Sequence, residues 1–184
     1  MADMKESPSQ TAGPYVHIGC VPGHAGLDGI YRDGDLGASM ITGAPDGEHL
    51  TLTLRILDGE AEPVRDALVE IWQPGPDGSF GPTEGFSHWG RQPAHPETGD
   101  ITFETLMPGS PKGQAPHILV WIAARGINLA LMTRIYFPGQ DNDADPIFTL
   151  AGDRAETMLA RPRAGGFGHV IHLQGNKETV FLDV

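Results

Sequence analysis

The sequence predicts an all-β fold, specifically a β-sandwich with long loops and one short helix near residues 146–160. Three observations support this prediction. About seven short segments alternate apolar and polar residues, or are apolar throughout, as strands do. The 25 glycines and 16 prolines lie between these segments as turn signals and do not form one low-complexity block. Many short strands separated by regular turn signals are typical of sandwiches.

The predicted strands can be followed along the chain. Residues 49–56 (HLTLTLRI) alternate strictly, which indicates a half-buried strand. Residues 67–72 and 101–107 alternate in part and are predicted to be strands as well. Residues 117–124 are almost entirely apolar, so we expect a central strand that is covered on both faces. The remaining predicted strands are residues 129–137, 168–174 and 179–184.

The segments between the strands differ in character. Residues 73–100 are a long irregular stretch rich in glycine, proline, aspartate and histidine, and loops of this length are often functional. Residues 147–160 are the best helix candidate, because Asp145 and Pro146 suit the N-cap and the first helical position. Residues 11–15 (TAGPY) are predicted to form a turn.

Composition limits the function classes. The chain has 184 residues, so we expect a single domain, at residues 11–184. Residues 1–10 are polar, and we expect them to be flexible. Its 12 basic and 24 acidic residues give a net charge of -12, which disfavours nucleic acid and anionic lipid as partners. The single cysteine, Cys20, cannot form an internal disulfide. With no apolar leader or membrane-spanning stretch visible, a cytoplasmic location is expected.

Histidines are the first candidates for a metal site. On a strand, residues two apart share a face, so His117 and Leu119 should point the same way, but leucine has no donor atom. His169 and His172 are three apart and should point to opposite faces, which prevents them from chelating one ion. A buried histidine such as His117 is more often a hydrogen-bonded core residue than a metal ligand.

Arg134 is a charged residue within an otherwise apolar predicted strand, LMTRIYF. A guanidinium in such a place requires an anion or a carbonyl as partner. Two interpretations remain open at this point. Arg134 forms an internal salt bridge or extends its charged end to the surface, or it binds a carboxylate of a ligand or of a partner chain.

Six segments, in order along the chain, form a pattern that is shared with one enzyme family. They are residues 9–19 (SQTAGPYVHIG), 69–73 (VEIWQ), 115–118 (APHI), 124–128 (ARGIN), 133–138 (TRIYFP) and 178–181 (ETVF). From about residue 7 to the C-terminus, the chain resembles the intradiol ring-cleavage dioxygenases. The first and fifth segments resemble the alpha-type chains of the heteromeric members.

This resemblance implies a β-sandwich core and an alpha–beta hetero-oligomer. The catalytic chains of the family bind ferric iron through two tyrosines and two histidines. Phe80 stands at the position of the first tyrosine, and Ser110-Pro111-Lys112 stand where the second is expected. His117 matches the first histidine, and Leu119 replaces the second. The resemblance therefore implies no metal on this chain, with these positions vestigial and the ferric iron bound by the catalytic beta chain of the complex.

The implied role is a subunit with no catalytic residue of its own. It would complete the active site of the beta chain for the O2-dependent intradiol cleavage of an aromatic dihydroxy acid, protocatechuate, to 3-carboxymuconate. By resemblance, the residues that line the substrate cleft are Thr11, Gly13, Pro14, Tyr15 and Arg134. Arg134 would offset the carboxylate of the substrate or position the N-terminal segment.

Two other functions remain open from the sequence. The chain could be a stand-alone binding or assembly module of sandwich type, because a fold does not fix a function. It could also be a self-sufficient metalloenzyme that uses loop histidines such as His88 and His95. Metal content and the mass of the assembly distinguish these functions from that of an assisting subunit.

Overall fold

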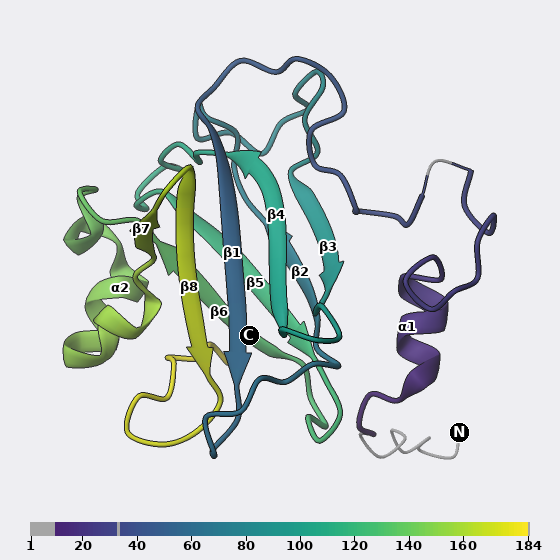
Figure 1. Ribbon diagram of the computed structural model, residues 1–184. Helices are drawn as coiled ribbons and strands as arrows, with labels where there is room; N and C mark the ends of the chain where they lie inside the picture. The colour runs from purple at the N-terminus through teal and green to yellow at the C-terminus, as the bar shows by residue number, and fades with distance from the viewer. Residues whose placement is uncertain (1–9, 33, 184) are drawn as a thin grey trace, which may run out of the picture.

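Two four-stranded sheets pack face to face in the computed structural model, which describes residues 10–32 and 34–183 (Figure 1). The predicted flexible segment at residues 1–10 therefore lies almost wholly outside the described residues. The two sheets confirm the prediction of an all-β sandwich.

The first sheet has the strand order β4-β1-β8-β7 and faces the viewer in Figure 1. Its strands are β1 (His49–Leu57), β4 (Asp100–Leu106), β7 (Arg161–Arg163) and β8 (Gly166–His172). β1 runs antiparallel to β4 but parallel to β8, whereas β7 and β8 are antiparallel. This sheet therefore joins a strand from early in the chain to one close to its end.

The second sheet has the order β3-β2-β5-β6 and is antiparallel throughout. Its strands are β2 (Leu68–Trp72), β3 (Trp89–Pro93), β5 (His117–Ala123) and β6 (Leu131–Tyr136). β5 lies between β2 and β6, which confirms the central position that its apolar sequence predicts.

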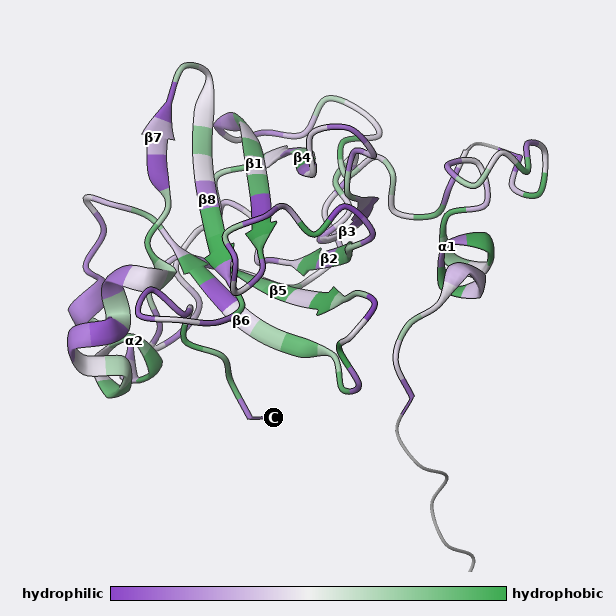
Figure 2. Cartoon of the chain, turned by 60° about the horizontal axis from the view of Figure 1, so that its bottom comes forward, coloured by the Kyte–Doolittle hydropathy of each residue, from purple (hydrophilic) through white to green (hydrophobic). Residues whose placement is uncertain are grey.

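The core lies between the sheets and follows from the alternation of the strands. Leu52, Leu54 and Ile56 of β1 are fully buried, and residues between them, such as Thr53, remain partly exposed on the outer face. The same rule places every second side chain of β5, such as Ile118, in the core. Figure 2 shows the resulting alternation of hydrophobic and hydrophilic bands along β1 and β8.

The structure corrects two parts of the strand prediction. β3 lies within residues 73–100, where no strand was expected, because its residues include a glycine and a proline and do not alternate clearly. Residues 179–184 are not a strand, so far as they are described. Instead, the Thr179 amide donates to the His172 carbonyl and the Leu182 amide donates to the Met132 carbonyl, so this segment links the two sheets.

The helices also differ from the prediction of one short helix. The segment at residues 146–160 is divided into α2 (Pro146–Ala151) and the 3-10 helix η2 (Gly152–Met158), because Gly152 has a positive φ of 56° and interrupts the α-helical geometry. A short 3-10 helix, η1 (Asn142–Ala144), precedes them. A further helix, α1 (Pro14–Cys20), replaces the turn expected near residues 11–15 and begins at a proline.

Candidate functional site

The site begins at one end of β5 and β6, on the outer face of the second sheet. His117 and Leu119 share this face, as expected, and their partners across the strand pair are Tyr136 and Arg134. His117 and Tyr136 are buried, whereas Leu119 and Trp121 remain partly exposed. The prediction that β5 is covered on both faces is therefore only partly correct for the isolated chain.

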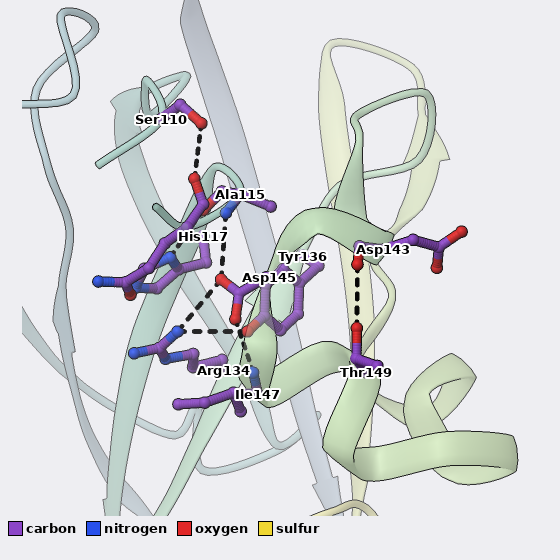
Figure 3. A network of polar contacts seen from close by, with 10 residues as sticks. Ser110, Ala115, His117, Arg134, Tyr136, Asp143, Asp145, Ile147 and Thr149 are labelled. Atoms are coloured by element: carbon purple, nitrogen blue, oxygen red, sulfur yellow. Dashed lines mark hydrogen bonds and ion pairs between the residues drawn. The ribbon is translucent and has the colours of Figure 1, made fainter. Parts of the chain in front are cut away.

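Asp145 is the centre of a buried polar network at this end of the sheet (Figure 3). Its side chain is fully buried, and Oδ2 accepts from the Ala115 amide at 3.1 Å. Oδ1 accepts from the Ile147 amide at 2.9 Å, which caps α2 as the sequence predicts. The Arg134 guanidinium lies 3.4 Å from Oδ2. One carboxylate therefore joins β6, α2 and the segment that leads into β5.

Arg134 thus has an internal partner, which supports the salt-bridge interpretation of this residue. The same nitrogen, Nη1, donates to the Tyr136 hydroxyl at 3.3 Å. Burial raises the pKa of Tyr136 to about 12, so this phenol stays protonated at neutral pH. The Arg134 Nε is also buried, and no hydrogen-bond partner for it is found among the described residues. Arg134 therefore retains donor capacity beyond its ion pair.

His117 is held as a neutral imidazole. Its Nδ1 lies 2.9 Å from the Ala115 carbonyl oxygen. Because a carbonyl can only accept, Nδ1 carries the hydrogen and Nε2 is left as an acceptor. Burial lowers the pKa of His117, an effect that the Ala115 carbonyl opposes in part and the Arg134 charge strengthens. His117 alone therefore offers one lone pair at this position.

The loop that carries Phe80 packs against the turn at Ser110. The Gly109 amide donates to the Gly75 carbonyl at 2.9 Å, and Gly78 approaches the Ser110 carbonyl so closely that no Cβ would fit. Ser110 in turn donates to the Gln114 carbonyl at 2.7 Å, just before β5. The Phe80 side chain is 47% exposed. The two loops named by the family resemblance therefore meet near the start of β5.

These residues do not fit the ferric iron that the family resemblance implies. Phe80 and Leu119 have no donor atom, and the two loops supply no phenol. Across residues 10–32 and 34–183, no group of three or more histidine, cysteine, aspartate or glutamate side chains is arranged to hold a metal ion. A single imidazole does not complete a coordination shell.

The N-terminal segment forms a second group of predicted site residues. The Thr11 hydroxyl accepts from the Gly126 amide at 2.6 Å, in the connection between β5 and β6. Gly13 and Pro14 border a small cavity of about 50 Å³ together with Arg125. Tyr15 is 84% exposed. The segment is therefore attached to the sandwich at Thr11 but presents its aromatic ring to the outside.

Two known proteins match this chain over nearly its whole length. The protocatechuate 3,4-dioxygenase alpha chain of Pseudomonas putida is 36% identical over 197 residues, covering 98% of this chain and 97% of that one. The alpha chain from Burkholderia cepacia is 32% identical over 202 residues and covers 100% of both. The chain belongs to this alpha-chain family. No protein-family model matches the sequence.

The chain is also similar to a protocatechuate 3,4-dioxygenase beta chain. The protocatechuate 3,4-dioxygenase beta chain of Burkholderia cepacia is 34% identical over 145 residues, which cover 69% of this chain and 61% of the beta chain.

Solved structures share the fold. An intradiol ring-cleavage dioxygenase from Tetranychus urticae has a TM-score of 0.61 at 21% identity, covering 82% of this chain and 95% of that one. The dioxygenase domain of a carbohydrate-binding fusion protein from Streptomyces sp. SirexAA-E has a TM-score of 0.57 at 24% identity, covering 90% and 96%. At these identities the likeness supports the sandwich fold and nothing finer.

The structure does not bring all predicted site residues of this alpha-family chain together. Arg134 lies beside α2, whereas Tyr15 lies on α1, and the two helices are on opposite sides of the sandwich in Figures 1 and 2. Among the described residues, no hydrogen bond or ion pair joins Arg134 to residues 11–15. Within one chain, the predicted substrate residues therefore form two separate groups.

Two residues of the network were not singled out by sequence reasoning. Tyr136 lies two positions after Arg134 on the same strand, so the alternation of β6 could have indicated that they share a face. Asp145 was identified as a helix cap, but its contact with Arg134 depends on how the chain folds back through η1, which no local pattern reveals.

The loop histidines proposed for a self-sufficient metalloenzyme have local partners instead. His88 lies 3.1 Å from the Thr83 hydroxyl and 3.1 Å from the Gln73 carbonyl. His95 accepts from the amides of Glu97 and Thr98 through Nδ1. These contacts favour a structural role for both rings.

His169 and His172 differ in burial as the strand alternation predicts. His169 is buried beneath the first sheet and His172 is partly exposed.

Between residues 10 and 183, with residue 33 left aside, no helix is long and apolar enough to cross a membrane.

Proposed function

We propose that this chain is the alpha subunit of an alpha/beta protocatechuate 3,4-dioxygenase and completes the substrate cleft of a catalytic beta chain. The reaction is the O2-dependent cleavage of protocatechuate to 3-carboxymuconate, and the ferric iron is bound by the beta chain. One observation carries the proposal. The chain matches alpha chains over its full length, and Phe80 and Leu119 offer no donor where the family resemblance places iron ligands.

The N-terminal part of the chain supports a partner subunit. Five of the ten exposed large hydrophobic side chains among the described residues lie between residues 15 and 36. α1 has seven residues and buries none of them, although helices this short are marginal without tertiary contacts. Exposed apolar side chains on a poorly packed helix are expected where a second chain covers them. We assign this surface to the beta chain.

The substrate part of the proposal rests on Arg134 and Tyr15. The acid group of protocatechuate needs a cation in a chain of net charge -12, and the Arg134 Nε has no partner among the described residues. Thr11 attaches the N-terminal segment to the Gly126 amide, Gly13 and Pro14 follow it in the chain, and the exposed Tyr15 ring is free to face a cleft. Since the two groups are separate within this chain, the beta chain must bridge them or reposition the segment.

The proposal also includes the domain organisation and the cellular location of the chain. We propose that residues 11–184 act as a single domain, which is supported by a core cluster that includes residues of both sheets. We also propose a cytoplasmic location, which is supported by the unpaired thiol of Cys20.

Co-expression tests the proposed function. This chain alone, the beta chain of the same organism alone, and both together should be purified and compared for iron content, visible absorbance and O2 uptake with protocatechuate. We expect the isolated alpha chain to be colourless and iron-free, and the complex to hold iron and consume O2. Stoichiometric iron or turnover in this chain alone would overturn the proposal. An unchanged monomer mass beside the beta chain would favour a stand-alone module.

A substitution in the complex tests the substrate role. Arg134→Gln should raise KM for protocatechuate about tenfold or more, because a charge-assisted contact to the carboxylate is lost. KM for catechol, which lacks that carboxylate, should stay within twofold. Arg154→Gln, at an exposed arginine that pairs with Glu178, is the matched control and should change neither value. Equal effects on both substrates would show that Arg134 is only structural.

A further inference from the structure

A large cavity lies on the outer face of the first sheet, whereas Arg134 belongs to the second sheet. Its volume is about 630 Å³, and its walls come from β1, β7, β8, η2 and the loop after β8. Strand register explains the floor. Thr53 pairs with Gly168, and Arg55 pairs with Val170, so small and polar side chains share this outer face. We call this cavity the outer groove.

The outer groove concentrates positive charge in an acidic protein. Four of the chain's 12 lysines and arginines border it, and so does His172. These cations are Arg55, Arg161, Arg163 and Lys177. Only two of the 24 acidic residues, Asp100 and Glu156, border the same space. Basic residues therefore outnumber acidic ones around this cavity, whereas acidic residues outnumber basic ones in the whole chain.

Most of this charge lacks an internal partner. Arg55 is neutralised, because it forms an ion pair with Asp100 at 2.6 Å. Among the described residues, no carboxylate lies within 4.0 Å of the charged groups of Arg161, Arg163 or Lys177. Three cations therefore face one cavity without an ion-pair partner, which leaves their charge available to a ligand.

Gly168 makes room for one of these cations. The Arg163 side chain crosses the sheet at Gly168, and a Cβ at that position would meet the Arg163 Cδ, Nε and Nη1 atoms. Arg161 pairs directly with Gly168 in the β7–β8 ladder, so both arginines project from the same face of the edge strand. Lys177 approaches from the loop after β8. The three charges thus come from two sides of the outer groove.

We propose that the outer groove binds a small organic anion with two or three carboxylates. A volume of 630 Å³ is typical of small-molecule sites, which span about 300–1,000 Å³. Planar guanidinium groups match carboxylates in geometry. Nucleic acid and anionic membranes are disfavoured, because the chain as a whole carries a charge of -12. The site is formed by the sheet opposite the Arg134 network, so this proposal does not rest on the proposed function.

Titration calorimetry at low ionic strength tests this proposal. Tricarballylate, a flexible tricarboxylate, should be titrated into the full chain and into the alpha/beta complex, with inorganic phosphate as the competing oxyanion. We expect one saturable tricarballylate site in both samples and at least tenfold weaker phosphate binding. The variant Arg161→Gln/Arg163→Gln should weaken tricarballylate binding at least tenfold. Lys177→Gln alone should weaken it several-fold.

The matched control removes two charges elsewhere. Arg65→Gln/Lys112→Gln changes two exposed cations that do not border the outer groove, and it should leave the affinity within twofold. Equal weakening in both double variants would reduce the effect to net charge and overturn the site. Phosphate binding as tight as tricarballylate would overturn the carboxylate assignment. Binding by the free chain that is absent from the complex would overturn the proposal, because the outer groove would then be a surface that a partner subunit covers.

Discussion

Acidification should destabilise this chain through His169, a buried histidine of β8. His169 is 6% exposed, and its Nδ1 lies 3.1 Å from the Leu159 carbonyl. Its Nε2 is buried, and no hydrogen-bond partner for it is found among the described residues. The pKa of His169 is lowered to about 4, mainly by burial. The hydrogen bond to the Leu159 carbonyl opposes this shift, whereas the nearby charges of Arg161 and His172 increase it. The ring is therefore neutral in the folded chain.

The sign and size of the effect follow from linkage. The unfolded chain binds a proton at His169 near pH 6.5 and the folded chain only near pH 4, so stability is complete above pH 6.5 and decreases as the pH falls toward 4. At 1.36 kcal/mol for each pKa unit, the maximum loss is about 3 kcal/mol. Between pH 7 and pH 5, the expected loss from this residue is about 2 kcal/mol.

The assay is urea denaturation at pH 7 and at pH 5, followed by tryptophan fluorescence. His169→Asn keeps an N–H that reaches the Leu159 carbonyl but cannot titrate, so the loss between the two pH values should shrink by about 2 kcal/mol. His49→Asn, at an exposed histidine of β1, is the control and should keep the wild-type difference. If His169→Asn loses as much stability as the wild type, the buried neutral ring does not explain the acid sensitivity.

Three further predictions concern the site and the first sheet. Asp145→Ala should lower the free energy of unfolding by about 3–5 kcal/mol, because the buried Arg134 charge loses its partner. Asp145→Asn should lower it by less, and equal losses for the two variants in urea denaturation would contradict this prediction. Gly166→Ala should lower the free energy of unfolding by about 2 kcal/mol more than Gly168→Ala does. The reason is that a Cβ would meet the backbone of Thr51 at Gly166 but only the flexible Arg163 side chain at Gly168. Equal melting temperatures of the two variants would contradict this prediction. The phenolate absorbance that Tyr136→Phe removes should develop near pH 12, and its development near pH 10 would refute the burial argument.

Much of the fold could be predicted because alternation is a local signal. The segment at residues 49–56 shows its buried and exposed faces directly in the sequence, and the strand observed there is β1. β3 could not be found in this way, because its position depends on cross-strand contacts such as those of Trp89 and Arg91 with Glu70. α1 had a signal that was underused, namely a proline at the first helical position.

The candidate site could be predicted only within single strands. The shared face of His117 and Leu119 follows from their spacing on β5. The contact between Arg134 and Asp145 could not be predicted, because it joins a strand to a helix cap through an intervening 3-10 turn. The outer groove is the feature that sequence patterns predict least, because it depends on the parallel pairing of β1 with β8. These two strands are adjacent in the sheet but far apart in the sequence.

The parallel pairing of β1 with β8 also constrains how the chain matures. Thr51 lies beside Gly166 in this ladder, so β1 has an open edge until β8 has left the ribosome. The second sheet has no such delay, because its strands pair with neighbours that are synthesised soon after them. Long-range pairing slows folding, and unpaired edges invite aggregation. A truncated product that ends before β8 would therefore be a poor building block for any assembly.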